Sequence, residues 1–138
     1  STATLNPPTM TCPCDETTNR KQDQQKKDMY YIEKTFEISS SHKLTLSYRS
    51  KCENLHGHNW KITVMCKAET LDENGMVVDF SVVKRRIQEK LDHKNLNDIL
   101  PFNPTAENMA RWITEQVPHC YCTIVQESEG NVAKYCID

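Results

Sequence analysis

Residues 56–67 read HGHNWKITVMCK, and apolar and polar side chains alternate along them. The two parities differ sharply: His58, Trp60, Ile62, Val64 and Cys66 fall on one, and Asn59, Lys61, Thr63 and Lys67 on the other. Successive side chains of a strand point to opposite faces, so this pattern predicts a strand with one buried face. His56 and His58 are two residues apart and are therefore expected to project to the same side.

The segment that starts at Met29 shows the same alternation. Its apolar residues share one parity: Tyr30, Ile32, Phe36 and Ile38. His42 shares that parity if the strand persists to it. An antiparallel pairing that sets His42 opposite His56 also sets Ile38 opposite Trp60, which matches apolar with apolar. One register therefore satisfies the core and gathers three imidazoles at one end of a hairpin.

Three imidazoles gathered in this way fit a zinc site. Zinc takes nitrogen ligands at about 2.0–2.1 Å, and a catalytic site keeps the fourth tetrahedral corner for water or substrate. A lone histidine beside a strand is more often an ordinary hydrogen-bonded group, but hairpin geometry joins His42 to His56 and His58. Neutral imidazoles without an apparent carboxylate ligand favour zinc, and iron or another transition metal is the alternative.

Cys52 lies four residues before His56 and has two possible roles. As a fourth ligand it would close a structural zinc site of one thiolate and three imidazoles. As a neighbour of the metal it would act as a thiolate base or nucleophile, and Lys51 beside it would favour the anion. Sequence spacing does not separate these readings.

Four further acidic or basic groups are candidates for proton transfer or binding. Asp92 and His93 are adjacent, and a carboxylate that orients an imidazole suits a proton relay, although His93 at a helix C-terminus has an ordinary capping explanation. Glu127, on a strand, and Glu107, in the first turn of a helix, have equally ordinary readings as exposed carboxylates. Each is weak alone.

Composition limits the function classes. The chain has 138 residues, 26% of them charged, and a formal charge of −2, which gives no electrostatic case for nucleic-acid binding. No apolar run is long enough to span a bilayer, so no membrane partner is expected. Seven cysteines, an odd number without a secretory signal, favour a cytosolic protein with reduced thiols, in which Cys66, Cys122 and Cys136 are small hydrophobic residues.

Two domains of different character are expected. Residues 1–28 are polar and lack periodicity, which predicts an arm without its own core, and Cys12 and Cys14 within it are interpreted as an incidental pair. Residues 29–138 hold the folded domain. After the first two strands, helices are expected from about residue 80 to 91 and from about 105 to 117, followed by strands at 120–127 and 131–137. This ββααββ order predicts an α+β fold, an antiparallel sheet with both helices on one face.

Six ordered blocks of the sequence resemble the 6-pyruvoyltetrahydropterin synthase family, and most of all its bacterial 6-carboxytetrahydropterin synthase branch. The blocks are Phe36–Leu44, Lys51–His58, Gly75–Phe80, Leu91–Asn97, Pro104–Asn108 and Val125–Ser128. The three residues between Cys52 and His56 resemble the carboxy branch, because the animal enzymes have a longer insert there. The polar arm is the main departure from the family.

The resemblance implies a T-fold (tunnelling fold), with trimers that close into a barrel and two trimers that stack as a homo-hexamer. It also implies roles for the candidate residues. His42, His56 and His58 would hold one Zn²⁺ per subunit, with Cys52 as general base outside the metal's coordination. Asp92 and His93 would form the relay, joined across a subunit contact by Glu127. Glu127, Thr105 and Glu107 would contact the pterin.

The activity that the resemblance implies is conversion of 7,8-dihydroneopterin triphosphate to 6-carboxy-5,6,7,8-tetrahydropterin, with release of triphosphate and acetaldehyde, in the queuosine pathway. The nearest alternative is the pyruvoyl product of the biopterin pathway. A third alternative, from another class, is a non-enzymatic zinc-stabilised interaction domain in which Cys52 is the fourth ligand.

Overall fold

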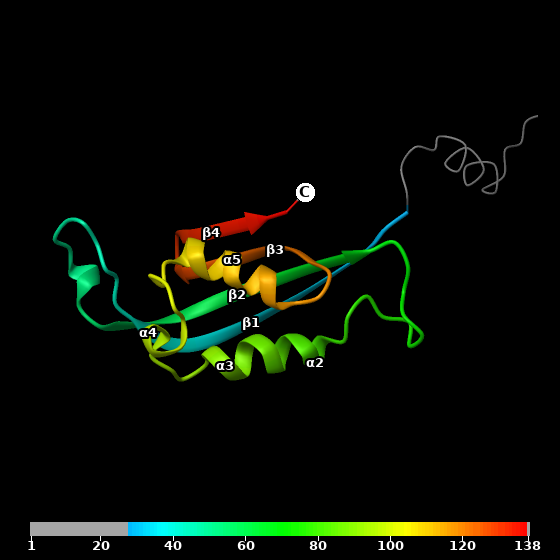
Figure 1. Cartoon of the computed structure of the whole chain (residues 1–138), viewed down its shortest axis with the longest axis horizontal. Coiled ribbons are helices and arrows are strands. Elements are labelled where there is room, and N and C mark those ends of the chain that lie inside the picture. The colour runs from blue at the N-terminus through cyan, green and yellow to red at the C-terminus, as the bar shows by residue number, and fades with distance from the viewer. Residues whose placement is uncertain (1–27, 138) are drawn as a thin grey trace, which may run out of the picture.

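A four-stranded antiparallel sheet, with its strands in the order β1-β2-β3-β4, organises the chain. The computed structural model describes residues 28–137. Its strands are β1 (Tyr30–His42), β2 (His56–Ala68), β3 (Cys120–Ser128) and β4 (Asn131–Cys136). Figure 1 shows the helical segments running alongside this sheet. The expected α+β class and strand order are confirmed, whereas residues 1–27, with Cys12 and Cys14, lie outside the described part.

The register of the first hairpin is the one that the apolar pattern predicts. His42 pairs with His56, Ile38 with Trp60, and the same antiparallel ladder continues to Tyr30 and Ala68. Each strand is 13 residues long, so this hairpin is the largest part of the sheet. The two histidine-bearing strand ends meet at one end of the hairpin.

The helical layer is more divided than the sequence pattern predicts. The first expected helix is one continuous helical run, with a π-helical middle: α2 (Phe80–Val83), η2 (Lys84–Gln88) and α3 (Glu89–Leu91). Asp79 caps it by accepting a hydrogen bond from the Ser81 amide at 2.9 Å. The second expected helix is α5 (Ala106–Gln116), capped by Thr105. Two short helices were not expected, η1 (Lys51–Glu53) and α4 (Leu96–Ile99).

One apolar core joins the sheet to the helices. Buried side chains of β2 share a single parity and cluster with those of the helices: Trp60, Ile62 and Val64 with Ile87, Leu91, Met109 and Ile113. The helices therefore cover one face of the sheet. Within residues 28–137, no helix combines the length and hydrophobicity that a membrane crossing requires.

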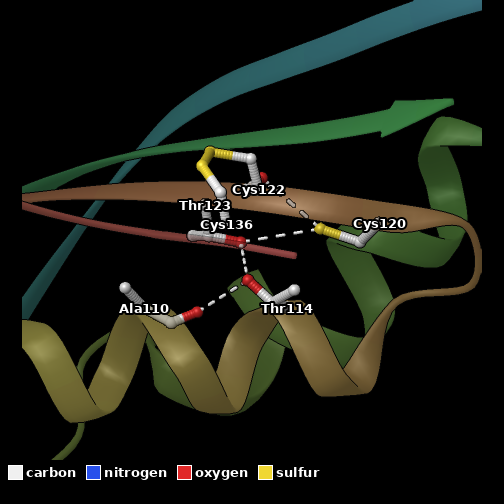
Figure 2. Close-up of a disulfide and its surroundings, with 6 residues drawn as sticks. All are labelled: Ala110, Thr114, Cys120, Cys122, Thr123 and Cys136. Atoms are coloured by element: carbon white, nitrogen blue, oxygen red, sulfur yellow. Dashed lines mark hydrogen bonds between the residues drawn. A yellow bond between two sulfur atoms is a disulfide. The ribbon is translucent and has the colours of Figure 1, made fainter. Parts of the chain in front are cut away.

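The expectation of reduced thiols is wrong for two cysteines. Cys122 and Cys136 form a disulfide, drawn in Figure 2. The cause is the β3–β4 register, which sets these two residues directly opposite each other with their Cα atoms 4.0 Å apart. Cys66, by contrast, is a buried free thiol in the core, as expected.

Candidate metal centre

Three imidazoles converge where β1 and β2 meet. Among residues 28–137, His42, His56 and His58 form a group whose potential ligand atoms all lie within 4.8 Å of one another. The pairing of His42 with His56 positions them, and His58 follows on the same side of β2. Their rings pack edge to face, with centroids 4.7–5.1 Å apart. The predicted gathering of the three histidines is confirmed.

Backbone carbonyls orient two of the three rings. Nδ1 of His42 donates to the carbonyl of Pro104 at 2.8 Å, and Nδ1 of His56 donates to the carbonyl of Asn54 at 2.6 Å. Each ring therefore carries its proton on Nδ1 and leaves the Nε2 lone pair free. A metal-binding histidine commonly uses its other nitrogen in this way, which fixes the tautomer and the ring orientation. The Pro104 carbonyl, 62 residues away in sequence, has no signal in the local pattern around His42.

The arrangement of the three Nε2 atoms fits a metal ion. Nε2 of His42 lies 3.1 Å from Nε2 of His56, close to the separation of about 3.3 Å expected for two ligands at about 2.0–2.1 Å on a tetrahedral ion. Nε2 of His58 is buried and has no hydrogen-bond partner in the described structure. Two lone pairs in contact and an orphaned buried nitrogen are costly alone, and a cation would satisfy all three. The residues present therefore fit a metal ion.

Burial keeps these rings in the form that binds metal. Desolvation lowers the pKa of His42 below its usual value, and the hydrogen bond to Pro104 only partly opposes this shift. Desolvation also lowers the pKa of His58, against the attraction of Glu127. The neutral imidazole is the ligand form, so both shifts favour binding near neutral pH.

Glu127, which the family resemblance assigns to the site, adds a carboxylate beside the histidines. One of its oxygens lies 3.4 Å from Nε2 of His58, and the other lies 3.9 Å from Nε2 of His42. The ladder between β3 and β4 shifts register between Gln126 and Ser128, so Glu127 sits at a bulge, a common device for re-aiming a side chain. Each chain therefore supplies its own Glu127 to its own histidine cluster.

Asp92 and His93 lie at the end of the first helical run, beside β1. Asp92 accepts a hydrogen bond from the Ser39 amide at 2.8 Å, and its other oxygen lies 3.6 Å from Nε2 of His93. The His93 amide donates to the Ser39 carbonyl at 2.7 Å, and His93 has a left-handed φ of 56°. This backbone conformation is uncommon for a residue other than glycine and is often associated with functional sites.

A pocket of about 480 Å³ connects this pair to the histidine cluster. It is lined by His93 and His58, with Ser39, Ser40, Ser41, Gly57, Asn59 and Lys94. The His93 side chain is 81% exposed and is therefore available to a bound molecule. The structure brings the Asp92–His93 pair and one metal-site histidine to a shared hollow.

Cys52 lies in η1, on the loop between β1 and β2, and is not part of the three-histidine group. Its thiol is free and partly exposed. The backbone of the loop is tied down locally, because the Cys52 carbonyl accepts from the Leu44 amide at 2.7 Å. This arrangement favours the reading in which the sulfur lies outside the metal's coordination.

Thr105 and Glu107 lie at the start of α5, next to Pro104. Oγ1 of Thr105 accepts from the Asn108 amide at 3.1 Å, and Glu107 is exposed in the first turn. Since Pro104 contacts His42, the beginning of α5 is adjacent to the histidine cluster. Their binding role stays a prediction.

The fold and the site define a class of protein: an α+β domain whose antiparallel sheet carries three convergent histidines beside a polar pocket. Residues 31–136 match the family model of 6-pyruvoyl tetrahydropterin synthase, and the chain belongs to this family.

Curated relatives and solved structures agree with this assignment. The chain is 35% identical over 121 residues to the 6-carboxy-5,6,7,8-tetrahydropterin synthase of Synechocystis, covering 78% of this chain and 93% of that protein. It is 29% identical over 129 residues to the human 6-pyruvoyl tetrahydrobiopterin synthase, covering 75% and 89% respectively. The structure of the Caenorhabditis elegans 6-pyruvoyl tetrahydropterin synthase is similar with a TM-score of 0.65 at 25% identity, covering 81% of this chain and 98% of that one.

Proposed function

We propose that the protein is a zinc-dependent lyase that converts 7,8-dihydroneopterin triphosphate to 6-carboxy-5,6,7,8-tetrahydropterin, with release of triphosphate and acetaldehyde, in the queuosine pathway. The convergence of three Nε2 atoms beside the His93-lined pocket is the observation that carries this proposal. Similarity to the Synechocystis enzyme favours the carboxy product.

His42, His56 and His58 would hold the Zn²⁺ through Nε2, with one tetrahedral corner left for the substrate. Bound there, the ion supplies Lewis-acid chemistry at the side-chain oxygens of the substrate, which makes the adjacent C–H bond easier to ionise. The donor set fits because two Nδ1 atoms are already engaged by carbonyls, which leaves Nε2 for the metal.

The protein's own groups would carry the proton transfers. Cys52, as thiolate, would take the proton from the side-chain carbon. His93, oriented by Asp92, would move a proton on or off the side-chain oxygen. The exposure of the His93 ring at the pocket supports this role, because a relay group must reach the reacting atom.

Substrate binding would involve Glu127, Thr105 and Glu107 at the pterin ring. A carboxylate is a suitable acceptor for the amino and ring N–H groups of a pterin. Glu127 is supported by its position against the histidine cluster, which would hold the pterin next to the metal.

The second candidate function is the pyruvoyl synthase reaction, which uses the same site and the same triphosphate elimination but keeps the side chain. It is supported by the 29% identity with the human enzyme. The two reactions differ in carbon–carbon cleavage. Which of the two products forms would therefore depend on how the site holds the intermediate after triphosphate has left.

Product analysis tests the proposal. The zinc-loaded protein would be incubated with 7,8-dihydroneopterin triphosphate, with the pterin identified by mass spectrometry and acetaldehyde assayed separately. We expect 6-carboxytetrahydropterin and an equal amount of acetaldehyde. A pyruvoyl product without acetaldehyde would favour the second candidate, and unchanged substrate would refute both.

We also propose a homo-hexamer, a dimer of trimers with active sites at subunit contacts. In the described part of the chain, β1 and β4 are the two edges of the sheet and have no partner on their outer side. A long unpaired edge favours pairing with another chain, and joining β4 of one chain to β1 of the next would close a barrel. In such an assembly Asp92 and His93 of one chain would also meet Glu127 of its neighbour.

A further inference from the structure

A second pair of cysteines faces each other across β2 and β3. Cys66 and Cys120 are register partners just beyond a bulge in the β2–β3 ladder, as the disulfide-bonded Cys122 and Cys136 are partners across β3 and β4. The bulge is the reason why Cys120 and Cys122, two residues apart, do not share a face. Directly opposite residues in an antiparallel pair project to the same face, so the two thiols lie together. Their sulfurs are hydrogen-bonded to each other. Both are free thiols.

The two thiols differ in access to solvent. Cys66 is 2% exposed and belongs to the apolar core, whereas Cys120 is partly exposed at the start of β3. A reagent in solution therefore reaches Cys120 first. Cys66 is buried in the core with the sulfur of Cys120 as its neighbour.

Polar groups around Cys120 stabilise its thiolate. Oγ1 of Thr123 lies 3.6 Å from its sulfur and can donate to the thiolate, and Thr123 accepts from Oγ1 of Thr114 at 2.8 Å (Figure 2). In its protonated form the thiol donates to the Cys122 carbonyl at 3.5 Å. The hydrogen bond from Cys66 is the largest cause that lowers the pKa of Cys120, to about 6. The same contact, with burial, raises the pKa of Cys66. Cys120 is thus the attacking thiolate and Cys66 the resolving thiol.

We propose that Cys66 and Cys120 are a redox-responsive dithiol that closes to a second cross-strand disulfide when the protein meets a small disulfide such as oxidised glutathione. The Cys120 thiolate attacks one sulfur of oxidised glutathione, which breaks the S–S bond and releases one glutathione thiolate. Cys66 then loses its proton to that thiolate and attacks the Cys120 sulfur, which expels the second glutathione. The protein loses two electrons, and oxidised glutathione is reduced to two molecules of glutathione.

The new bond would form in addition to the existing one, not by exchange with it. Cys122 and Thr123 are neighbours on β3 and point to opposite faces. Figure 2 shows the Cys122–Cys136 bridge on the side of β3 away from α5, whereas Thr123 and the sulfur of Cys120 lie toward α5. The strand backbone therefore separates the Cys120 thiolate from the disulfide. The proposal is independent of the proposed catalytic function.

Peptide mapping of the wild-type protein tests this directly. The protein is treated with oxidised glutathione, its remaining thiols are blocked with N-ethylmaleimide, and it is digested with trypsin. Cys66 lies in the peptide Ile62–Lys67, Cys120 and Cys122 lie in Trp112–Lys134, and Cys136 lies in Tyr135–Asp138. We expect all three peptides in one covalent species, which requires both disulfides at once.

Other mapping results would overturn the proposal. Recovery of Ile62–Lys67 without a link, or of Cys120 still carrying glutathione, would mean that Cys66 does not resolve the adduct. A species that joins Ile62–Lys67 to Trp112–Lys134 but lacks Tyr135–Asp138 would mean exchange with the existing bridge.

Variants test the roles within the pair. Cys66→Ala should trap glutathione on Cys120, and the pH midpoint for Cys120 alkylation by iodoacetamide should rise from about 6 by at least about one pH unit, because the thiolate loses its donor. Cys66→Ser retains a hydroxyl donor and should show a smaller rise. Equal midpoints in wild type and Cys66→Ala would contradict the assigned roles. Circular dichroism would establish that each variant is folded.

Discussion

At the scale of single residues, the site depends on which atoms remain free. Carbonyls of Pro104 and Asn54 engage Nδ1 of His42 and His56, so both rings offer Nε2 to a metal. The histidines themselves follow from strand parity, since residues two apart share a face. The carbonyl partners of these rings do not follow from strand parity. Pro104, for example, lies in the segment between α4 and α5 and reaches His42 only in the folded chain. The gathering of the three histidines was therefore predictable from sequence, and the groups that orient their rings were not.

Cys52 gives the first prediction at this scale. Cys52→Ala should retain the metal and lower turnover by about 10²–10⁴-fold, the contribution typical of a general base. Metal content by atomic absorption and initial rates with dihydroneopterin triphosphate would be measured on the same sample. Cys120 is a free thiol of similar burial at the start of β3, so Cys120→Ser is the matched control and should retain both metal and turnover. Loss of metal from Cys52→Ala would identify the sulfur as a ligand instead.

At the scale of elements, two asparagines extend the ordered edge of β1 into the Cys52 loop. The side-chain amide of Asn97 forms paired hydrogen bonds with the backbone of Lys43, at 2.8 and 2.9 Å. The side-chain amide of Asn103 does the same with Thr45, at 2.9 and 3.0 Å. Each side-chain amide hydrogen-bonds to the N–H and C=O of one residue, as the backbone of an adjacent strand would. The beginning of the loop that carries Cys52 is thereby held in place.

Removing these contacts should loosen the loop. In the double variant Asn97→Ala, Asn103→Ala, the amides of Lys43 and Thr45 should exchange with solvent faster, by up to about tenfold each, since one hydrogen bond contributes about 0.5–1.5 kcal/mol. Hydrogen exchange followed by NMR would measure this, together with a lower turnover at unchanged metal content. Asn131→Ala, which removes an exposed side-chain bond to Ser128, is the control. Unchanged exchange at Lys43 and Thr45 would refute the role of these asparagines.

Element order and the β1–β2 register were predictable because both strands alternate strictly over many residues. The register that sets Ile38 opposite Trp60 buries both side chains on one face of the sheet. The Cys122–Cys136 disulfide was missed because β4 is short and exposed, so its sequence pattern does not fix a register. The residue pattern alone placed Glu127 only on a strand, and its role at the site came from the family resemblance. The bulge that directs it to the histidines depends on the β3–β4 register, which the sequence pattern does not fix.

At the scale of the whole molecule, the open sheet gives a prediction about assembly. Sedimentation equilibrium should give a mass six times that of the 16.0 kDa chain. Val132 on β4 is 56% exposed, and Val132→Lys should lower the mass by placing a charge on the edge strand. Val132→Thr, which keeps the branched shape without a charge, should remain hexameric. A wild-type monomer at every concentration would contradict the assembly.

The central claim is an open metal centre made of three imidazoles, with the thiol of Cys52 close to it but not bonded to it. X-ray absorption at the zinc edge of the zinc-loaded protein tests it most directly. We expect three nitrogen ligands at about 2.0–2.1 Å with oxygen from water, and no sulfur. A sulfur ligand at about 2.3 Å would contradict the account and would favour a closed structural site.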